Sequence, residues 1–426
     1  MAFSTAKPIF YGWKMIVVLA ITELISYGVL FYSFTIFIKP MQSELGWLSA
    51  EITGGYSLSL GITALCAIVV GYRLDRSGPR WIMTAGSCLA ALLVLAWANV
   101  QTLPAFYAIW FGLGVAKAMV LYDPAFWVVA NWFIRRRRQA LTLLTFIAGF
   151  STLIFTPLTQ VLVEQFGWRN ALVILALLLA LVTIPLHALV LRRRPADVGL
   201  QPDGDTYPDV PVEAGEVEAE VTGLPLRRVI RGSSFWWLTS AFTLNSMMVT
   251  VLGIYLVPYL IDTGYEAGFA ALAAGLIGLT SLPGRIIFTL SGSRWSPGGI
   301  VALLFLMQTV SMVILVTTRS QAAVLAYIIL YGAGYGAITP SRAGLVAEFY
   351  GRVEYGAISG LMSLCVTIVT AVAPVIAGAV IDQSGSYQAV LWGLITLSGV
   401  SVGLVLLAVY TRPRGEVGFV VPAVGD

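Results

Sequence analysis

The chain has 426 residues, of which 58% are hydrophobic and only 11% are charged. A soluble protein carries about 25% charged residues, so the composition excludes a soluble globular protein and indicates a polytopic membrane protein. The net charge of +4 comes from an excess of arginine, which we interpret as a topology signal and not as a nucleic-acid surface.

Apolar segments long enough to cross a bilayer, about 20 residues each, recur along nearly the whole chain. We predict twelve spans, at residues 12–38, 51–72, 80–100, 105–131, 139–164, 169–191, 235–259, 266–290, 297–317, 321–348, 355–381 and 387–410. The chain is therefore expected to be an all-α membrane protein.

The loops differ in their content of basic residues. Lys and Arg in short loops stay in the cytoplasm, and most of the arginines outside the spans fall on one side: Arg73, Arg76, Arg80, Arg135 to Arg138, Arg192 to Arg194, Arg227, Arg228, Arg231, Arg294, Arg352, Arg412 and Arg414. Because the number of spans is even, both termini are predicted to be cytoplasmic.

Between the sixth and seventh spans, residues 195–223 hold eight acidic residues and four prolines. Such a stretch buries too little apolar surface to fold alone. We therefore predict four parts: an N-terminal six-helix bundle at 1–191, a cytoplasmic linker at 192–234, a C-terminal six-helix bundle at 235–411 and a cytoplasmic tail at 412–426.

The two halves repeat each other. The segment GYRLDR from Gly71 matches TLSGSR from Thr289, and VEQFGWRNAL from Val163 matches IDQSGSYQAV from Ile381 at the same offset of 218 residues. Transporters built from repeats bind substrate near the midplane and move one half against the other. The repeat therefore favours two pseudo-symmetric six-helix bundles.

The loop GYRLDRSGPR (71–80) resembles the cytoplasmic signature of the major facilitator superfamily, and TLSGSR is its degenerate second copy. This resemblance implies the major facilitator fold and transport by alternating access. It also implies a gating role for the loop, in which Asp75 and neighbouring arginines form a charge network. The gating residues expected on this basis are Gly71, Arg73, Asp75, Arg76, Arg80 and Arg294.

Within the superfamily, YGWKMIVV (11–18) and FYSFTIFIKPMQSELGW (31–47) resemble the monocarboxylate transporter and oxalate:formate antiporter branch, and NWFIRRRRQAL and FGWRNAL fit its bacterial members. The resemblance implies that Arg285, four residues before Thr289, pairs with a substrate carboxylate. Two positions depart from the branch: Ser281 replaces a frequent acid or amide, and Tyr32 stands where some members have a lysine. These departures leave the coupling chemistry open.

Five ionisable residues lie well inside the predicted spans: Glu23, Lys117, Asp123, Arg285 and Arg342. A charge at the bilayer centre costs about 2.5 to 3.5 kcal/mol on insertion scales, so such residues usually face the bundle interior and carry function. Arg285 presents a planar fork that can hold a carboxylate with two hydrogen bonds. The alternatives are that it snorkels to lipid headgroups or joins the two halves by an ion pair.

The other two cations have two interpretations each. Arg342 is either a second cation for the substrate or a partner of Glu348 or Asp75. Lys117 is either a third cation or the partner of Glu23, because buried lysines are seldom left unpaired.

Glu23 and Asp123 are the carboxyl groups in the spans that could bind and release a proton. Desolvation favours the neutral acid and a nearby cation favours the ionised form, which would couple proton and substrate movement; the alternative is charge balance. Tyr32, Tyr122 and Tyr331 are expected to pack on the ligand and donate to it, or else to be core residues.

The sequence thus predicts a secondary transporter of a small organic anion, a mono- or dicarboxylate, in symport with protons, in the bacterial inner membrane. A rival on the same fold exports an amphipathic or aromatic compound, and a further rival is a receptor that transports nothing. We find no enzyme motif and expect no cofactor and no metal site. The expected partners are the substrate, protons and membrane lipid, and the expected state is a monomer.

Overall fold

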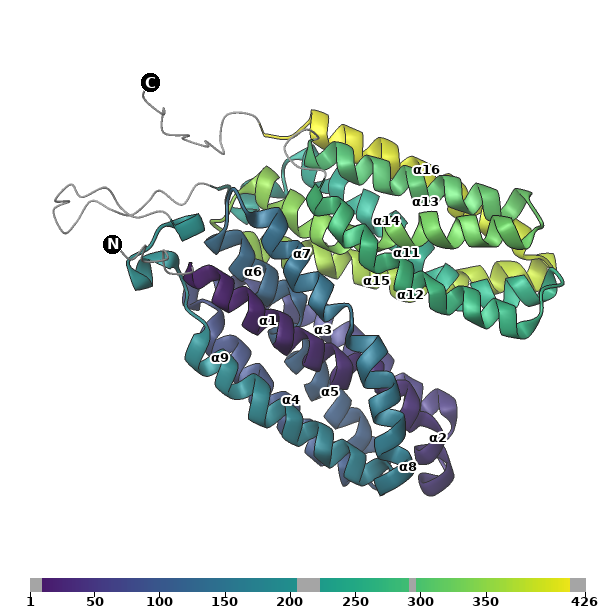
Figure 1. Ribbon diagram of the computed structural model, residues 1–426, viewed down its shortest axis with the longest axis horizontal. Coiled ribbons are helices and arrows are strands. Elements are labelled where there is room, and N and C mark those ends of the chain that lie inside the picture. Colours follow the sequence, from purple (N-terminus) through teal and green to yellow (C-terminus); the bar gives the residue numbers. More distant parts are fainter. Residues whose placement is uncertain (1–9, 205–222, 291–295, 414–426) are drawn as a thin grey trace, which may run out of the picture. The chain divides into compact units, whose positions relative to one another are not determined.

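The computed structural model describes residues 10–204, 223–290 and 296–413. The chain forms two compact units, Met1–Glu220 and Val221–Asp426. The division falls inside the segment predicted as a linker. Each unit is a bundle of helices (Figure 1), and the part of the chain that the structure describes holds one isolated β-bridge, Gly223 to Gly351, and no longer strand.

The first unit begins with a broken helix, α1 (Tyr11–Tyr27), a π-helical turn (Gly28–Tyr32) and α2 (Phe34–Leu45). It continues with α3 (Ser49–Ser77), α4 (Pro79–Ala98), α5 (Leu103–Val120), α6 (Tyr122–Trp132), α7 (Arg137–Ala148), α8 (Ser151–Leu178), a π-helical turn (Leu179–Thr183), α9 (Ile184–Val190) and two 3₁₀ turns (Pro195–Val198, Pro202–Gly204). Helix α5 packs between α3 and α4, and α1 packs against α7.

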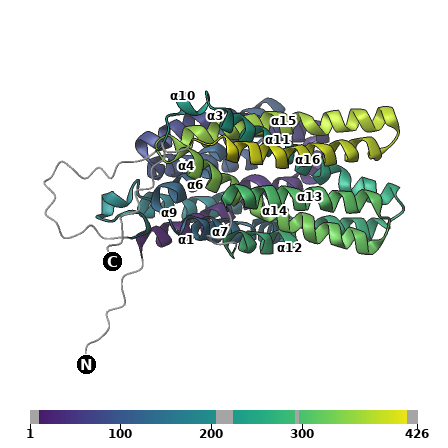
Figure 2. The same ribbon diagram turned by 90° about the horizontal axis from the view of Figure 1, so that it is seen from above.

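The second unit holds α10 (Leu226–Val229), α11 (Ser233–Asp262), α12 (Ala267–Leu290), α13 (Pro297–Thr317), α14 (Gln321–Tyr350), α15 (Tyr355–Ser384) and α16 (Tyr387–Tyr410). Helix α14 packs against both α12 and α13, and α16 packs against both α11 and α13, as Figure 2 shows.

Ten segments of the described chain are long and apolar enough to cross a membrane. One of them, Arg137–Val190, has 54 residues and contains two predicted spans, which meet at Gly167 with φ 76° and ψ 159°. Helix α12 contains one further predicted span. The structure therefore accommodates the twelve predicted spans, six in each unit, and the all-helical fold is confirmed.

Many large apolar side chains point outward, among them Leu65, Leu92 and Leu181, which are 57%, 64% and 73% exposed. In water such a surface would be costly, whereas in a bilayer it faces lipid while each helix satisfies its own backbone hydrogen bonds. The pattern is that of a membrane-embedded bundle.

Both ends of the central segment are tied to the unit they adjoin. The carboxylate of Asp203 accepts hydrogen bonds from the backbone N–H groups of Ile134 (3.1 Å), Arg135 (2.8 Å) and Arg136 (3.1 Å), in the turn between α6 and α7. In the second unit, Leu226 donates its backbone N–H to the Glu354 carboxylate at 2.6 Å, in the turn between α14 and α15.

The opposite end of the first unit is held by Arg169 on α8. Its guanidinium donates to Glu44 Oε1 (2.8 Å) and to the backbone oxygens of Ala98 (2.7 Å) and Val100 (3.0 Å). Hydrogen bonds from Arg169 and Trp168 lower the pKa of the Glu44 carboxyl from its ordinary value. This contact joins the ends of α2 and α4 to the middle of α8, just after its break at Gly167.

Candidate functional site

The fourth predicted span is interrupted in the first unit. Helix α5 ends at Val120 and α6 begins at Tyr122, because Leu121 is extended (φ −85°, ψ −165°). Lys117 lies in the last turn of α5 and Asp123 in the first turn of α6. A cation at a helix C-terminus and an anion at an N-terminus are both favourable. Transporters commonly use such discontinuous helices to form binding sites.

Lys117 is held inside the first unit by aromatic rings and a hydroxyl. It is 1% exposed, its ammonium group donates to Ser59 Oγ at 2.9 Å, and it lies 4.6 Å from the ring centre of Tyr56 and 4.9 Å from that of Trp110. Within the described residues no carboxylate contacts it. The ion pair with Glu23 that the sequence suggested is therefore not formed, because α5 turns Lys117 toward α3.

Glu23 lies on α1 and is fully buried. Neither of its carboxyl oxygens has a hydrogen-bond partner among the described residues. The charged group that acts on it electrostatically is Asp123, so the two acids predicted from the sequence are brought near each other. Two carboxylates that lie near each other repel when both are ionised.

Aromatic side chains surround this pair. Tyr27 on α1 packs on Tyr122 with ring centres 4.6 Å apart, and lies 6.3 Å from Tyr32. The π-helical turn between Tyr27 and Tyr32 departs from regular α-helix, and such turns are frequent at functional sites. The ring centre of Phe31, in that turn, lies 5.7 Å from that of Tyr56. Because Tyr56 also contacts Lys117, this contact connects the aromatic cluster to the lysine.

The first unit thus gathers five of the predicted site residues. They are Glu23, Tyr32, Lys117, Tyr122 and Asp123. Sequence reasoning missed Ser59 and Tyr56 as neighbours of Lys117, because no spacing along the chain relates α3 to α5. It also missed Trp110, although Trp110 lies seven residues before Lys117 on the same face of α5.

In the second unit, Arg285 is half-buried on α12. Next to it, Gly284 lies so close to α14 that a Cβ there would be 2.0 Å from the backbone oxygen of Ala333. A Cβ on Gly336 would likewise be 1.8 Å from the backbone oxygen of Ser281. These glycines let the two backbones touch, and with the contact of Gly332 with Thr280 they place Arg285 about one residue beyond Gly336 along α14.

Arg342 is half-buried on α14, two residues after Pro340. Glu348, one of the partners considered for it, accepts a hydrogen bond from Arg412 Nη1 at 3.4 Å. The role of Arg342 in binding stays a prediction.

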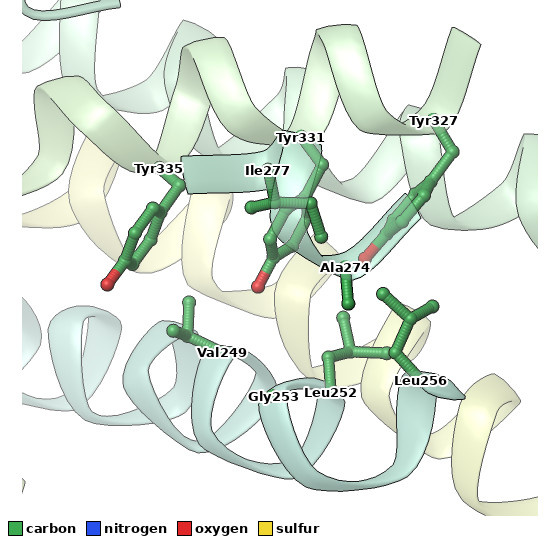
Figure 3. Close-up of a pocket in the computed structure, with 9 residues that line it drawn as sticks. All are labelled: Val249, Leu252, Gly253, Leu256, Ala274, Ile277, Tyr327, Tyr331 and Tyr335. Carbon is green, nitrogen blue, oxygen red and sulfur yellow. The ribbon is translucent and has the colours of Figure 1, made fainter. Parts of the chain in front are cut away.

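Tyr331 lines a cavity in the second unit, between α11, α12 and α14 (Figure 3). The cavity has a volume of about 220 Å³ and is lined by three tyrosines and six other residues: Tyr327, Tyr331, Tyr335, Val249, Leu252, Gly253, Leu256, Ala274 and Ile277. Arg285 and Arg342 are not among them. Sequence reasoning missed Tyr327, although its spacing from Tyr331 and Tyr335 places all three on one helix face.

The loop predicted to act as a gate makes contacts different from those expected. Asp75 accepts a hydrogen bond from Trp127 Nε1 on α6 at 2.7 Å. Arg76 lies over the Tyr72 ring at 4.2 Å, and Arg80 Nε donates to the backbone oxygen of Ala188 at 2.6 Å.

Among the described residues, none of Arg73, Arg76 and Arg80 pairs with the Asp75 carboxylate. Gly71 is buried and Arg73 is exposed, and Arg294 lies outside the described residues. The gating role of these residues stays a prediction.

Comparison with known proteins identifies the fold. A family model described as Major Facilitator Superfamily matches residues 19–365 and 298–422. Among solved structures, the chain is similar to the transporter FucP in its outward conformation, with a TM-score of 0.69 and 17% identity over 94% of this chain and 98% of that one. It is also similar to the human organic anion transporter MFSD10, with a TM-score of 0.67 and 16% identity over 95% and 100% of the two chains.

Two relatives match along about nine tenths of their length. Monocarboxylate transporter 13 of Bos taurus is 25% identical over 414 residues, covering 94% of this chain and 91% of the relative. The uncharacterized MFS-type transporter YcxA of Bacillus subtilis (strain 168) is 23% identical over 394 residues, covering 90% of this chain and 92% of the relative.

Proposed function

The chain belongs to the Major Facilitator Superfamily of membrane transporters, and on that premise we propose that it carries a small organic anion, a mono- or dicarboxylate, together with protons. Arg285 binds the carboxylate, and Glu23 with Asp123 takes up the proton. The proposal includes a multi-pass monomer in the bacterial inner membrane with both termini in the cytoplasm.

The observation that carries the proposal is the environment of Glu23. Its carboxyl group is buried without a hydrogen bond in the described chain, and a second acid, Asp123, acts on it. The competing interpretation was charge balance with Lys117 and the arginines. Lys117 contacts Ser59, Tyr56 and Trp110, which speaks against its part in that balance. Burial disfavours the ionised form of an acid, and water or a nearby cation favours it, so such an acid can bind and release a proton as its surroundings change.

Two further observations support an anionic substrate. Arg285 is a permanent charge inside a predicted span, and an arginine within the membrane part of a transporter commonly marks a substrate path. Relatives that match along most of the chain are named monocarboxylate transporters. The proposed direction of transport is uptake, driven by protons that move with the anion.

Uptake of labelled carboxylates into proteoliposomes tests the role of Arg285. We expect Arg285→Gln to abolish uptake and Arg285→Lys to retain a small part of it, because a lysine keeps the charge but not the two-pronged hydrogen bonds. Arg412→Gln is the matched control, since Arg412 is 41% exposed in its side chain and contacts Glu348. Uptake by Arg285→Gln at the rate of Arg412→Gln would contradict the proposal.

A further inference from the structure

The cavity of the second unit has the size and lining of a site for a flat ring. Its volume of about 220 Å³ is enclosed by aliphatic side chains, a glycine and tyrosine rings, and no charged residue lines it. An engineered apolar cavity of about 150 Å³ binds benzene. The cavity therefore has room for a benzene ring with a substituent.

Tyr327, Tyr331 and Tyr335 form one wall. The ring centre of Tyr331 is 5.1 Å from that of Tyr327 and 6.3 Å from that of Tyr335. Figure 3 shows the three phenol oxygens pointing from α14 toward α11. Tyr327 is fully buried, whereas Tyr335 is 40% exposed. The cavity thus has a closed end at Tyr327 and a mouth at Tyr335.

The closed end carries a polar group, the Tyr327 hydroxyl, that no described residue hydrogen-bonds. This hydroxyl is buried. Leaving a buried hydroxyl without a partner is unfavourable. A ligand with a polar group at its far end would remove this cost.

The position of Arg285 sets the length of such a ligand. Helices α12 and α14 run in parallel register, with Thr280 at Gly332 and Gly284 at Gly336, so Arg285 lies about one residue beyond Gly336 along α14. From there back to Tyr327 the helix rises about 15 Å. The arginine side chain, which leans toward the N-terminus of its helix, and a hydrogen bond at each end take up part of this distance. A single six-membered ring with one substituent at each end spans the rest.

We infer that this cavity receives the ring of an aromatic carboxylate whose opposite end bears a hydroxyl or similar polar group. The inference rests on the proposed function only for the acid end, which Arg285 binds. The ring lies between the tyrosine wall and α11, and the far polar group pairs with the Tyr327 hydroxyl. The substrate is then an aryl acid and not a short aliphatic acid such as acetate.

Gly253 allows the cavity to be filled without disturbing the fold. It lines the cavity on α11, and a Cβ added there meets no atom within 4 Å. Leucine is also a better helix former than glycine. Gly403 on α16 is an equally open glycine that does not line the cavity, so Gly403→Leu is the matched control for Gly253→Leu.

The test measures binding to the full-length protein in lipid nanodiscs. The probes are 4-hydroxyphenylacetate, phenylacetate, hexanoate and acetate. We expect phenylacetate to bind about tenfold or more tighter than acetate, because the ring is buried. Gly253→Leu should remove this preference without changing acetate binding, and Gly403→Leu should keep it.

Tyr327→Phe tests the far end. In the wild type 4-hydroxyphenylacetate should bind roughly three- to tenfold tighter than phenylacetate, which corresponds to one hydrogen bond. Tyr327→Phe should abolish that difference and leave phenylacetate binding unchanged. Hexanoate binding as tight as phenylacetate, or an unchanged ring preference in Gly253→Leu, would overturn the assignment of a ring site.

A neutral probe separates this inference from the proposed function. If no carboxylate is transported but 4-methylphenol binds to the wild type and not to Gly253→Leu, the ring site stands and the anion carrier is wrong. If carboxylates are transported with Arg285 required and 4-methylphenol binds equally to wild type and Gly253→Leu, the carrier stands and the ring site is wrong.

Discussion

The buried ammonium group of Lys117 permits a sharp test of what holds the first unit together. We expect Lys117→Met to change the free energy of unfolding by less than about 2 kcal/mol. The lysine gains about 2 kcal/mol from each of two desolvated cation–π contacts and about 1.5 to 3 kcal/mol from its hydrogen bond to Ser59. Burying one charge costs several kcal/mol, which nearly offsets this sum.

Two details of the structure favour a small effect. Ser59 Oγ also donates to the backbone oxygen of Tyr56 at 2.7 Å, so its hydroxyl keeps a partner when the ammonium group is removed. Methionine fills a similar volume between Tyr56 and Trp110. Lys117→Ala, by contrast, leaves a cavity and should cost about 2 to 5 kcal/mol, as truncations of long buried side chains do.

The assay is unfolding by SDS in mixed micelles, monitored by tryptophan fluorescence, for the wild type, Lys117→Met and Lys117→Ala. Uptake by the same proteins then separates stability from function. If Lys117→Met is destabilised as strongly as Lys117→Ala, the ammonium contacts outweigh its desolvation, and the reasoning is refuted.

Two further predictions concern the ends of the first bundle. Gly78 has φ 74° and ψ 179°, a conformation that costs other residues about 1 to 3 kcal/mol; Gly78→Ala should lower the unfolding free energy by at least that amount, while Gly61→Ala, in open space on α3, should not lower it. The lowered pKa of Glu44 means that its ionised form stabilises the fold at neutral pH. Glu44→Gln should cost at most about 1 kcal/mol at pH 7, and its deficit from wild type should vanish as the pH falls below the ordinary glutamate range near 4.3 and through the lowered pKa. A deficit independent of pH would contradict the contact with Arg169.

The spans could be predicted from the sequence because lipid demands that each crossing segment satisfy its own backbone, which leaves long apolar runs. The break in the fourth span was not predicted. Pro124, in the first turn of α6, is consistent with a new helix beginning there. It did not lead to that prediction, because the apolar run continues across it without a polar gap. The acids and tyrosines of the first unit were identified singly from the sequence. The acids were the easier to find, because a charge inside a span is rare.

Their partners were not predictable in the same way. Which face of α5 carries Lys117 to Ser59 depends on packing between helices that are apolar on all sides, so hydropathy gives no inward direction. The same limit applies to Tyr327: its spacing from Tyr331 and Tyr335 is visible in the sequence, but the cavity they share is formed with α11 and α12.

The most direct test of proton-coupled anion transport measures both species at once. Proteoliposomes in weak buffer receive a carboxylate, and the external pH and internal carboxylate are followed for wild type and Glu23→Gln. We predict external alkalinisation in step with uptake by the wild type. Because glutamine resembles the protonated acid, Glu23→Gln should keep carboxylate exchange and lose both acid-driven accumulation and the pH change. Uptake without alkalinisation in the wild type, or undiminished acid-driven accumulation in Glu23→Gln, would contradict the account.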